Sequence, residues 1–182
     1  MTVRLLLTGR AGCGKTTLLK SLLDRFPNRF GGFYTEEVRA YGERIGFTIT
    51  TVDRTRSALF ASVSFSKSKF RVSKYGVDVA GFERIAVGEI RSAIAEDKPL
   101  AIDEIGKMEL FSGEFRTLLE EVFSSSLPVI ATVHAHSHPF TDALKKRSDV
   151  ELITLDRSSF DAVLRRLTDT VADRIFNQKE SR

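Results

Sequence analysis

Residues 9–16, GRAGCGKT, constrain the fold of this 182-residue chain more than any other segment. They match the spacing G-x-x-x-x-G-K-[ST], with the apolar run VRLLLT before them and leucines at helical spacing after them. Glycines let a backbone wrap around an anion without Cβ clashes, and the loop N–H groups and the positive end of the next helix then bind phosphate oxygens. The motif therefore predicts a phosphate-binding loop between a buried strand and a helix.

The hydrophobic pattern of the chain predicts an α/β fold. Apolar or alternating runs predict strands at 3–8, 31–38, 44–52, 58–66, 69–73, 100–102, 127–133 and 150–155. Helical spacing predicts helices at 15–26, 82–96, 114–123, 139–146 and from Asp156 or Ser158 to Phe176. Fully apolar strands that alternate with helices are typical of a mostly parallel sheet with helices on both faces. We expect one domain over residues 1–182, with a β-rich insert at 31–75 that forms antiparallel strands at one edge of the sheet.

The apolar segments are short. No segment is apolar for long enough to span a membrane, and the run before Gly9 is too short for the core of a signal peptide. The one cysteine, Cys13, excludes an internal disulfide and suits a reducing compartment. We therefore expect a cytoplasmic protein with no membrane partner.

The net charge of +4 is unevenly distributed. Residues 1–80 contain 14 of the 28 Lys and Arg but 6 of the 24 Asp and Glu. The excess sits mainly in 54–74, which has no acid and in which Phe60, Phe65 and Phe70 lie among basic residues. Such a segment suits single-stranded RNA, whose phosphates attract cations and whose bases stack on aromatic rings. A solvated basic face is the alternative, and the more common one.

Two adjacent carboxylates, Asp103 and Glu104, follow the predicted strand at 100–102. Ligands of open α/β sheets lie beyond the carboxyl ends of the strands, so this strand and the strand at 3–8 deliver residues to the same crevice. We expect Asp103 to hold Mg²⁺ there through metal-bound water, and Glu104 to polarise an attacking water. A solvated pair of acids that opens a turn is the alternative.

Three further residues complete this hypothesis. Lys15 is expected to reach the β- and γ-phosphates, and the Thr16 hydroxyl to bind Mg²⁺. Lys107 could help to neutralise the charge that develops during reaction. A protein that only binds nucleotide needs the first acid but not the second, so Glu104 favours hydrolysis. The predicted catalytic residues are therefore Glu104, Lys15 and Lys107, and the predicted metal-linked residues are Thr16 and Asp103.

Several motifs together resemble one known family. GRAGCGKTTL, GFYTEEVR, GERIGF, YGVDV and DEIGKMELFS occur in this order along the chain. In this arrangement the chain resembles the THEP-type nucleoside-triphosphatases, a P-loop family that includes the cancer-related nucleoside triphosphatases. The resemblance runs nearly end to end, and it implies a RecA-like, three-layer α/β/α domain. It also implies slow, Mg²⁺-dependent hydrolysis of ATP, GTP and other nucleoside triphosphates to the diphosphate and phosphate.

The resemblance implies two nucleotide-contacting segments, one on each side of the insert. The first is the Walker A motif with the residue after it, and the second contains the Walker B acids. By position in this sequence, these residues are Gly9, Arg10, Ala11, Gly12, Cys13, Gly14, Lys15, Thr16 and Thr17, and then Ile102, Asp103, Glu104, Ile105, Gly106, Lys107, Met108 and Glu109.

The segment HAHSH places His134, His136 and His138 at alternating positions. Alternation on a strand could aim the three imidazoles the same way, as in a metal site. No acid or cysteine completes a ligand set, however, so a metal site is disfavoured. A polar residue at the strand tip, Thr132 or His134, could instead lie near the γ-phosphate.

Arg39 and Arg44 flank the first turn of the insert, and either could act as an arginine finger. Ordinary surface charge is the alternative. Phe33, Tyr34 and Phe47 could stack on a base, but core packing is favoured for all three.

Two other functions stay open from the sequence. One is a nucleoside or nucleotide kinase, although the insert predicts β structure rather than an arginine-rich helical lid. The other is an RNA-binding module, or an RNA-stimulated nucleoside-triphosphatase, that uses the basic segment 54–74. The oligomeric state is open, with a monomer favoured.

Overall fold

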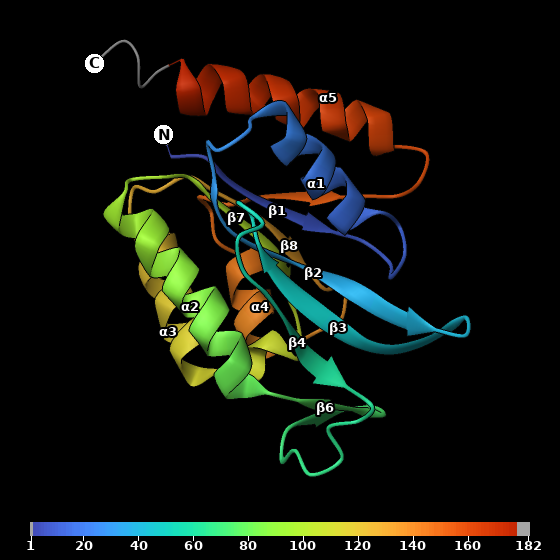
Figure 1. Ribbon diagram of the computed structural model, residues 1–182. Coiled ribbons are helices and arrows are strands. Elements are labelled where there is room, and N and C mark those ends of the chain that lie inside the picture. The colour runs from blue at the N-terminus through green and yellow to red at the C-terminus, as the bar shows by residue number, and fades with distance from the viewer. Residues whose placement is uncertain (1, 178–182) are drawn as a thin grey trace.

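The computed structural model describes residues 2–177, which form one nine-stranded sheet with helices on both faces (Figure 1). The strands are β1 (Arg4–Thr8), β2 (Gly31–Ala40), β3 (Glu43–Thr51), β4 (Ser57–Ser62), β5 (Arg71–Val72), β6 (Tyr75–Val77), β7 (Leu100–Ile105), β8 (Val129–Val133) and β9 (Glu151–Thr154). The helices are α1 (Lys15–Arg25), α2 (Val79–Ala95), α3 (Gly113–Ser124), α4 (Pro139–Lys145) and α5 (Phe160–Val171), with a 3-10 turn η1 (Glu109–Phe111) and a π turn η2 (Ala172–Phe176).

The strand order is β5-β6-β4-β3-β2-β7-β8-β1-β9. The five strands from β2 to β9 in this order pair in parallel, whereas β3, β4, β6 and β5 extend the sheet by antiparallel pairing. Helices α1 and α5 cover one face, and α2, α3 and α4 lie on the other (Figure 1). The predicted α/β fold, mostly parallel with an antiparallel extension, is confirmed.

Strand β1 shows how the two cores form. Leu5 and Leu7 pack against α1 and α5, while Leu6 points into the core under α2 and α3. This follows from the alternation of side chains along a strand, which sends a continuous apolar run to both faces of a sheet. Leu18 and Leu22 on α1 are fully buried over the first of these cores. The loop between β1 and α1 is thus anchored at both of its ends.

The predicted strand at 100–102 is longer than expected. Strand β7 continues to Ile105, so Asp103 and Glu104 lie within it rather than after it. The pairing of β7 with β8 has an irregularity between Ile102 and Ile105, after which Ile105 is opposite Val133. A carboxylate is tolerated in this buried strand because hydroxyl groups of two other elements donate hydrogen bonds to it.

The insert also differs from its prediction. Strand β2 is the parallel neighbour of β7, so the first strand of the segment 31–75 belongs to the parallel part of the sheet. The strand predicted at 58–66 ends at Ser62, and the one predicted at 69–73 is replaced by β5 and β6, two short strands. Hydrogen bonds from the Ser68 hydroxyl to Phe70 O and Val77 O hold a turn where the hydrophobic pattern predicted a strand.

Among the described residues, no helix has the length and apolar character that a membrane span needs.

Gly32 allows β2 to join β7. Its φ is +112°, and a Cβ at this position would lie 2.0 Å from the carbonyl oxygen of Ala101, its partner in the register. Neither the backbone conformation nor the contact with main-chain atoms can accept a side chain without a shift of one strand. The junction between the parallel strands and the antiparallel extension therefore depends on this glycine.

We predict that Gly32→Ala lowers the free energy of unfolding by about 2–5 kcal/mol, since left-handed strain and overpacking add. The matched control is Gly42→Ala in the β2–β3 turn, where φ is +81° but no atom lies within 4 Å of the added Cβ. The control should lose only about 1–2 kcal/mol, from the backbone conformation alone. Urea unfolding of both variants measures the difference, and equal losses would show that the close approach of Ala101 is unimportant.

Candidate active site

The loop Gly9–Thr16 connects β1 to α1 and leaves the first turn of α1 without a cap. Gly14 is the N-cap residue, with a φ of +104°, and no side chain accepts a hydrogen bond from the first turn. The N–H groups at the start of α1 therefore remain available to an anion. Within the loop, Arg10 and Ala11 are exposed. Cys13 is half-buried against the core under α1 and α5, which fits the role of a small space-filling residue.

Lys15 is the first residue of α1 and is almost entirely buried, with 9% of its side chain exposed. Its Nζ lies 3.5 Å from Glu104 Oε2 and 3.4 Å from the carbonyl oxygen of Gly9. A buried ammonium needs such partners because desolvation penalises an unpaired charge. The structure therefore brings together the loop lysine and the second acid of the pair, as the sequence predicted for one crevice.

Asp103 joins three elements of the fold. It is 1% exposed, and it accepts hydrogen bonds from Thr16 Oγ1 on α1, at 2.8 Å, and from Thr132 Oγ1 on β8. Burial raises the pKa of Asp103 to about 6, against the two hydroxyl donors, which lower it. The predicted metal-linked residues, Thr16 and Asp103, are thus in direct contact.

The carboxyl group of Glu109 lies close to that of Glu104. An ideal Cβ on Gly106 would be 2.8 Å from Glu109 Oε2 and 3.0 Å from Glu104 Oε1, so the two carboxyl groups flank this glycine. Burial raises the pKa of Glu109 to about 8, and the negative charge of Glu104 adds to the effect. Glu109 therefore carries a proton at neutral pH, whereas Glu104, with 30% of its side chain exposed, has access to solvent.

The segment after the acid pair is divided between core and surface. Ile102 and Ile105 are fully buried, Met108 is half-buried and Lys107 is exposed. Among the residues predicted to contact nucleotide, Thr17 on α1 is also exposed. Among the described residues, no hydrogen bond or ion pair joins Lys107 to Glu104. The catalytic role of Lys107 therefore stays a prediction.

The three histidines follow the end of β8, and two of them have hydrogen-bond partners on α4. His134 is buried, its Nε2 is 3.1 Å from Thr141 Oγ1, and burial together with the charge of Lys145 lowers its pKa to about 4. His138 caps α4, where its Nδ1 accepts a hydrogen bond from Phe140 N. Within residues 2–177, no cluster of three or more His, Cys, Asp or Glu could hold a metal ion.

Thr132 was predicted as a possible phosphate sensor, and its contact with Asp103 was missed. The strand register explains this contact, because Ile102 on β7 is opposite Ala131 on β8. The next residues along two parallel neighbours, Asp103 and Thr132, then point the same way. Strand pairing is the information that the sequence pattern lacked.

Two other groups of predicted residues have partners of their own. Arg39 and Arg44 both pair with Glu37, at 2.7 and 2.6 Å. Phe33 and Tyr34 are buried, which confirms core packing for these two. Phe47, in contrast, is only half-buried.

The basic segment 54–74 does not expose all of its aromatic residues. Arg54 pairs with Asp24 on α1, and Arg56 pairs with Glu89 on α2. Phe60 is 1% exposed and lies in the core, so the prediction that it could stack on a base is wrong. The alternation of β4 buries this ring, an effect that residue spacing alone did not reveal.

We predict that Glu109→Gln makes stability less dependent on pH. The folded protein raises the pKa of Glu109 from 4.5 to about 8, so its contribution to stability is complete below pH 4.5 and is lost as the pH rises through about 8. A glutamine stays neutral, so the free energy of unfolding should fall less between about pH 5 and pH 9 in the variant than in the parent. Urea unfolding without Mg²⁺ or nucleotide measures this, with exposed Glu114→Gln as the control. An unchanged slope in Glu109→Gln would contradict the assignment.

Comparisons with known proteins agree with this geometry. A family model described as NTPase matches residues 4–168. The nucleoside-triphosphatase THEP1 of Thermotoga sp. (strain RQ2) is 40% identical over 178 residues, which are 98% of this chain and 99% of that protein. The THEP1 protein of Methanothermobacter thermautotrophicus is 38% identical over 174 residues, 94% of this chain and 97% of its own length.

Solved structures show the same fold. The crystal structure of THEP1 from the hyperthermophile Aquifex aeolicus matches with a TM-score of 0.84 and 37% identity, over 91% of this chain and 96% of that one. The solution structure of a human cancer-related nucleoside triphosphatase matches with a TM-score of 0.79 and 30% identity, over 94% and 98% of the two chains. The chain therefore belongs to the NTPase family that contains the THEP1 nucleoside-triphosphatases, and it is an enzyme of that family.

Proposed function

We propose that the protein hydrolyses nucleoside triphosphates, ATP and GTP among them, to the diphosphate and phosphate at the end of β1 and β7. Gly9–Thr16 would be its Walker A motif, and Asp103 with Glu104 its Walker B acids. The observation that carries the proposal is that residues from the two motifs are already in contact. Thr16 donates to Asp103 at 2.8 Å, and Lys15 lies 3.5 Å from Glu104.

Binding of the triphosphate would proceed by exchange of partners on Lys15. Without a ligand, the ammonium is held by the Glu104 carboxylate and by the carbonyl oxygen of Gly9. The uncapped N–H groups at the start of α1 attract phosphate oxygens, and Lys15 then turns from Glu104 to the β- and γ-phosphates. This exchange leaves the Glu104 carboxylate free at the moment when the γ-phosphate arrives.

The oxygens of Thr16 and Asp103 fit a Mg²⁺ ion that arrives with the nucleotide. Hydroxyl and carboxylate oxygens are the ligands that Mg²⁺ prefers, and this ion is commonly bound by one or two protein groups together with phosphates and waters. Mg²⁺ would neutralise charge on the phosphates. Thr132 keeps the Asp103 carboxylate oriented toward Thr16.

Glu104 would act on the attacking water. Its carboxyl group is partly exposed, so it can contact water while its Oε1 stays beside Gly106. A carboxylate within hydrogen-bond reach of the water orients it and accepts its proton as the bond to phosphorus forms. Glu109 suits this role less well because it is already protonated at neutral pH.

The domain organisation, the cellular compartment and the range of substrates are proposed from the sequence. We propose that residues 1–182 are a single P-loop domain and that the protein works in a reducing compartment such as the cytoplasm, which suits the free thiol of Cys13. Several triphosphates are expected to be substrates, as the resemblance to the THEP-type nucleoside-triphosphatases implies. A kinase would need an acceptor hydroxyl, and turnover without any acceptor separates the two activities.

We predict that Lys15→Ala abolishes turnover and weakens nucleotide binding by at least about tenfold, because charge-assisted contacts contribute roughly 1.5–3 kcal/mol each. The assay is phosphate release from ATP, GTP, CTP and UTP without acceptor, together with calorimetric titration of a non-hydrolysable ATP analogue with Mg²⁺. The control is Lys20→Ala on the same helix, which removes an exposed pair with Glu36 and should keep both properties. Parental affinity in Lys15→Ala would exclude the loop as the phosphate site.

We predict that Glu104→Gln binds the triphosphate at least as tightly as the parent but hydrolyses it far more slowly. A positioned general base contributes about 10²–10⁴-fold to the rate. Binding should survive because the phosphate donors are unchanged, and it should tighten because glutamine competes less with phosphate for Lys15.

Single-turnover phosphate release and calorimetry separate the two effects of Glu104→Gln. Turnover within about a factor of two of the parent would show that the base lies elsewhere, since a base contributes about 10²-fold or more. Loss of binding together with turnover would show that Glu104 supports the metal or the fold instead.

A further inference from the structure

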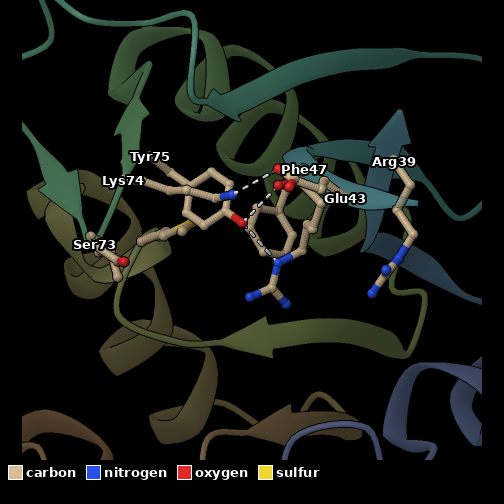
Figure 2. Close-up of a pocket in the computed structure, with 9 residues that line it drawn as sticks. Arg39, Glu43, Phe47, Ser73, Lys74 and Tyr75 are labelled. Carbon is tan, nitrogen blue, oxygen red and sulfur yellow. Dashed lines mark hydrogen bonds and ion pairs between the residues drawn. The ribbon is translucent and has the colours of Figure 1, made fainter. Parts of the chain in front are cut away.

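A groove of about 510 Å³ lies on the antiparallel extension of the sheet (Figure 2). Its walls come from the β2–β3 hairpin, from β5 and β6, and from the segment that follows β7. The residues that define its chemistry are Arg39, Arg44, Phe47, Lys74, Tyr75 and Met108. The groove includes no residue of the loop Gly9–Thr16, and Met108 is the one lining residue that it shares with the segment from Ile102 to Glu109.

Two aromatic rings and a guanidinium form one wall of the groove. The rings of Phe47 and Tyr75 lie 5.3 Å apart between centroids, at 73°, in an edge-to-face arrangement. The guanidinium carbon of Arg44 lies 5.1 Å from the centroid of Phe47 and 5.6 Å from that of Tyr75. Aromatic faces and guanidinium planes are the surfaces on which nucleobases stack in proteins.

Arg44 is fixed in place before any ligand arrives. Its Nε donates to Tyr75 Oη at 3.0 Å and its Nη1 to Glu37 at 2.6 Å, and these bonds raise its pKa above the ordinary value. Among the described residues, no hydrogen bond uses its Nη2, and 41% of the side chain is exposed. An ordered guanidinium with an open edge binds an anion at little cost in conformational entropy.

Two further cations line the groove: Arg39 lies to one side of the rings, and Lys74 Nζ lies over the ring of Tyr75, 5.8 Å from its centroid (Figure 2). Arg39 has 57% of its side chain exposed and Lys74 has 53%. Lys74 is only 3.9 Å from the exposed carboxylate of Glu43, a contact of the kind that contributes about 0–1 kcal/mol. The Glu43 carboxylate is therefore a weak competitor, and Lys74 can leave it for a stronger anion.

We propose that this groove is a second nucleotide-binding site, which takes a base against Phe47 and the guanidinium of Arg44, with the buried ring of Tyr75 behind them, and the attached phosphate on Lys74 and Arg44. The volume lies within the range of about 300–1,000 Å³ that is typical of small-molecule sites. A lone phosphate would use the cations and leave the rings unused, whereas a neutral aromatic compound would leave the cations unused. The ligand can be a free nucleotide or one nucleotide of a single strand of RNA, because both present the same two groups.

Met108 connects the groove to the proposed active site along the chain. It lines the groove and lies one residue before Glu109, in the segment that begins with the two acids of β7. A base bound on the ring wall would contact this methionine, whose flexible side chain adapts to the shape of a ligand. Occupancy of the groove can therefore act on the position of Glu109, which flanks Gly106 together with Glu104.

The test uses the full chain with Lys15→Ala, which suppresses binding at the loop, and measures binding of UMP, AMP and an oligouridylate by calorimetry. We expect at least one of these probes to bind, and Lys74→Ala added to this chain to weaken that binding by about tenfold, the effect of one charge-assisted contact. Phe47→Leu keeps an apolar side chain but removes the stacking face, and it should weaken nucleotide binding more than phosphate binding. Unfolding curves show whether each variant is folded.

Lys69→Ala is the matched control, because Lys69 is an exposed lysine of the same basic segment that does not line the groove. Binding of mononucleotides would identify a free nucleotide as a sufficient ligand, and binding of the oligomer alone would identify a single strand as the source. The proposal is overturned if no probe binds, if Lys74→Ala has no effect, or if Lys69→Ala weakens binding as much as Lys74→Ala. It is also overturned if inorganic phosphate binds as well as the nucleotides do.

Discussion

The buried carboxylate of Asp103 is the interaction on which the candidate site depends. Taken alone, a carboxylate inside a strand is unfavourable, and burial raises its pKa to about 6. It is stabilised by hydroxyl donors from α1 and from β8, so three elements that are far apart in the chain meet at one group. The position of the phosphate loop relative to the central strands follows from this contact, because Thr16 belongs to the first turn of α1.

The acids around Asp103 differ because their surroundings differ. Glu104 is partly exposed and lies beside the Lys15 ammonium, whereas Glu109 is buried beside Glu104 and keeps its proton. Burial and the nearby Glu104 both raise the pKa of Glu109, so Glu109 is the protonated acid of the site at neutral pH. The site thus has one charged group that can exchange partners with an incoming phosphate, and one neutral group that supports it.

The sequence predicted the features that depend on local pattern. The phosphate loop, the apolar strands and the helix α1 all have short-range signals, and the structure contains each of them. The sequence did not predict that β7 would include Asp103 and Glu104, or that β2 would pair in parallel with β7. Those features depend on which strands become neighbours, and pairing energy comes from contacts between residues that are distant along the chain. The prediction that Phe60 could stack on a base was wrong for the same reason, because the ring is buried.

Strand β2 connects the two halves of the molecule through its alternation. Glu36 points toward α1 and pairs with Lys20 at 2.6 Å, whereas Glu37 points to the other face and pairs with Arg44, also at 2.6 Å. Successive residues of a strand must face opposite sides, so these neighbouring acids contact the helix of the phosphate loop and the wall of the groove, respectively. A shift of β2 along β7 would move both contacts together. The close approach at Gly32 limits such a shift, so this glycine fixes the position of Glu36 and Glu37 relative to the central strands.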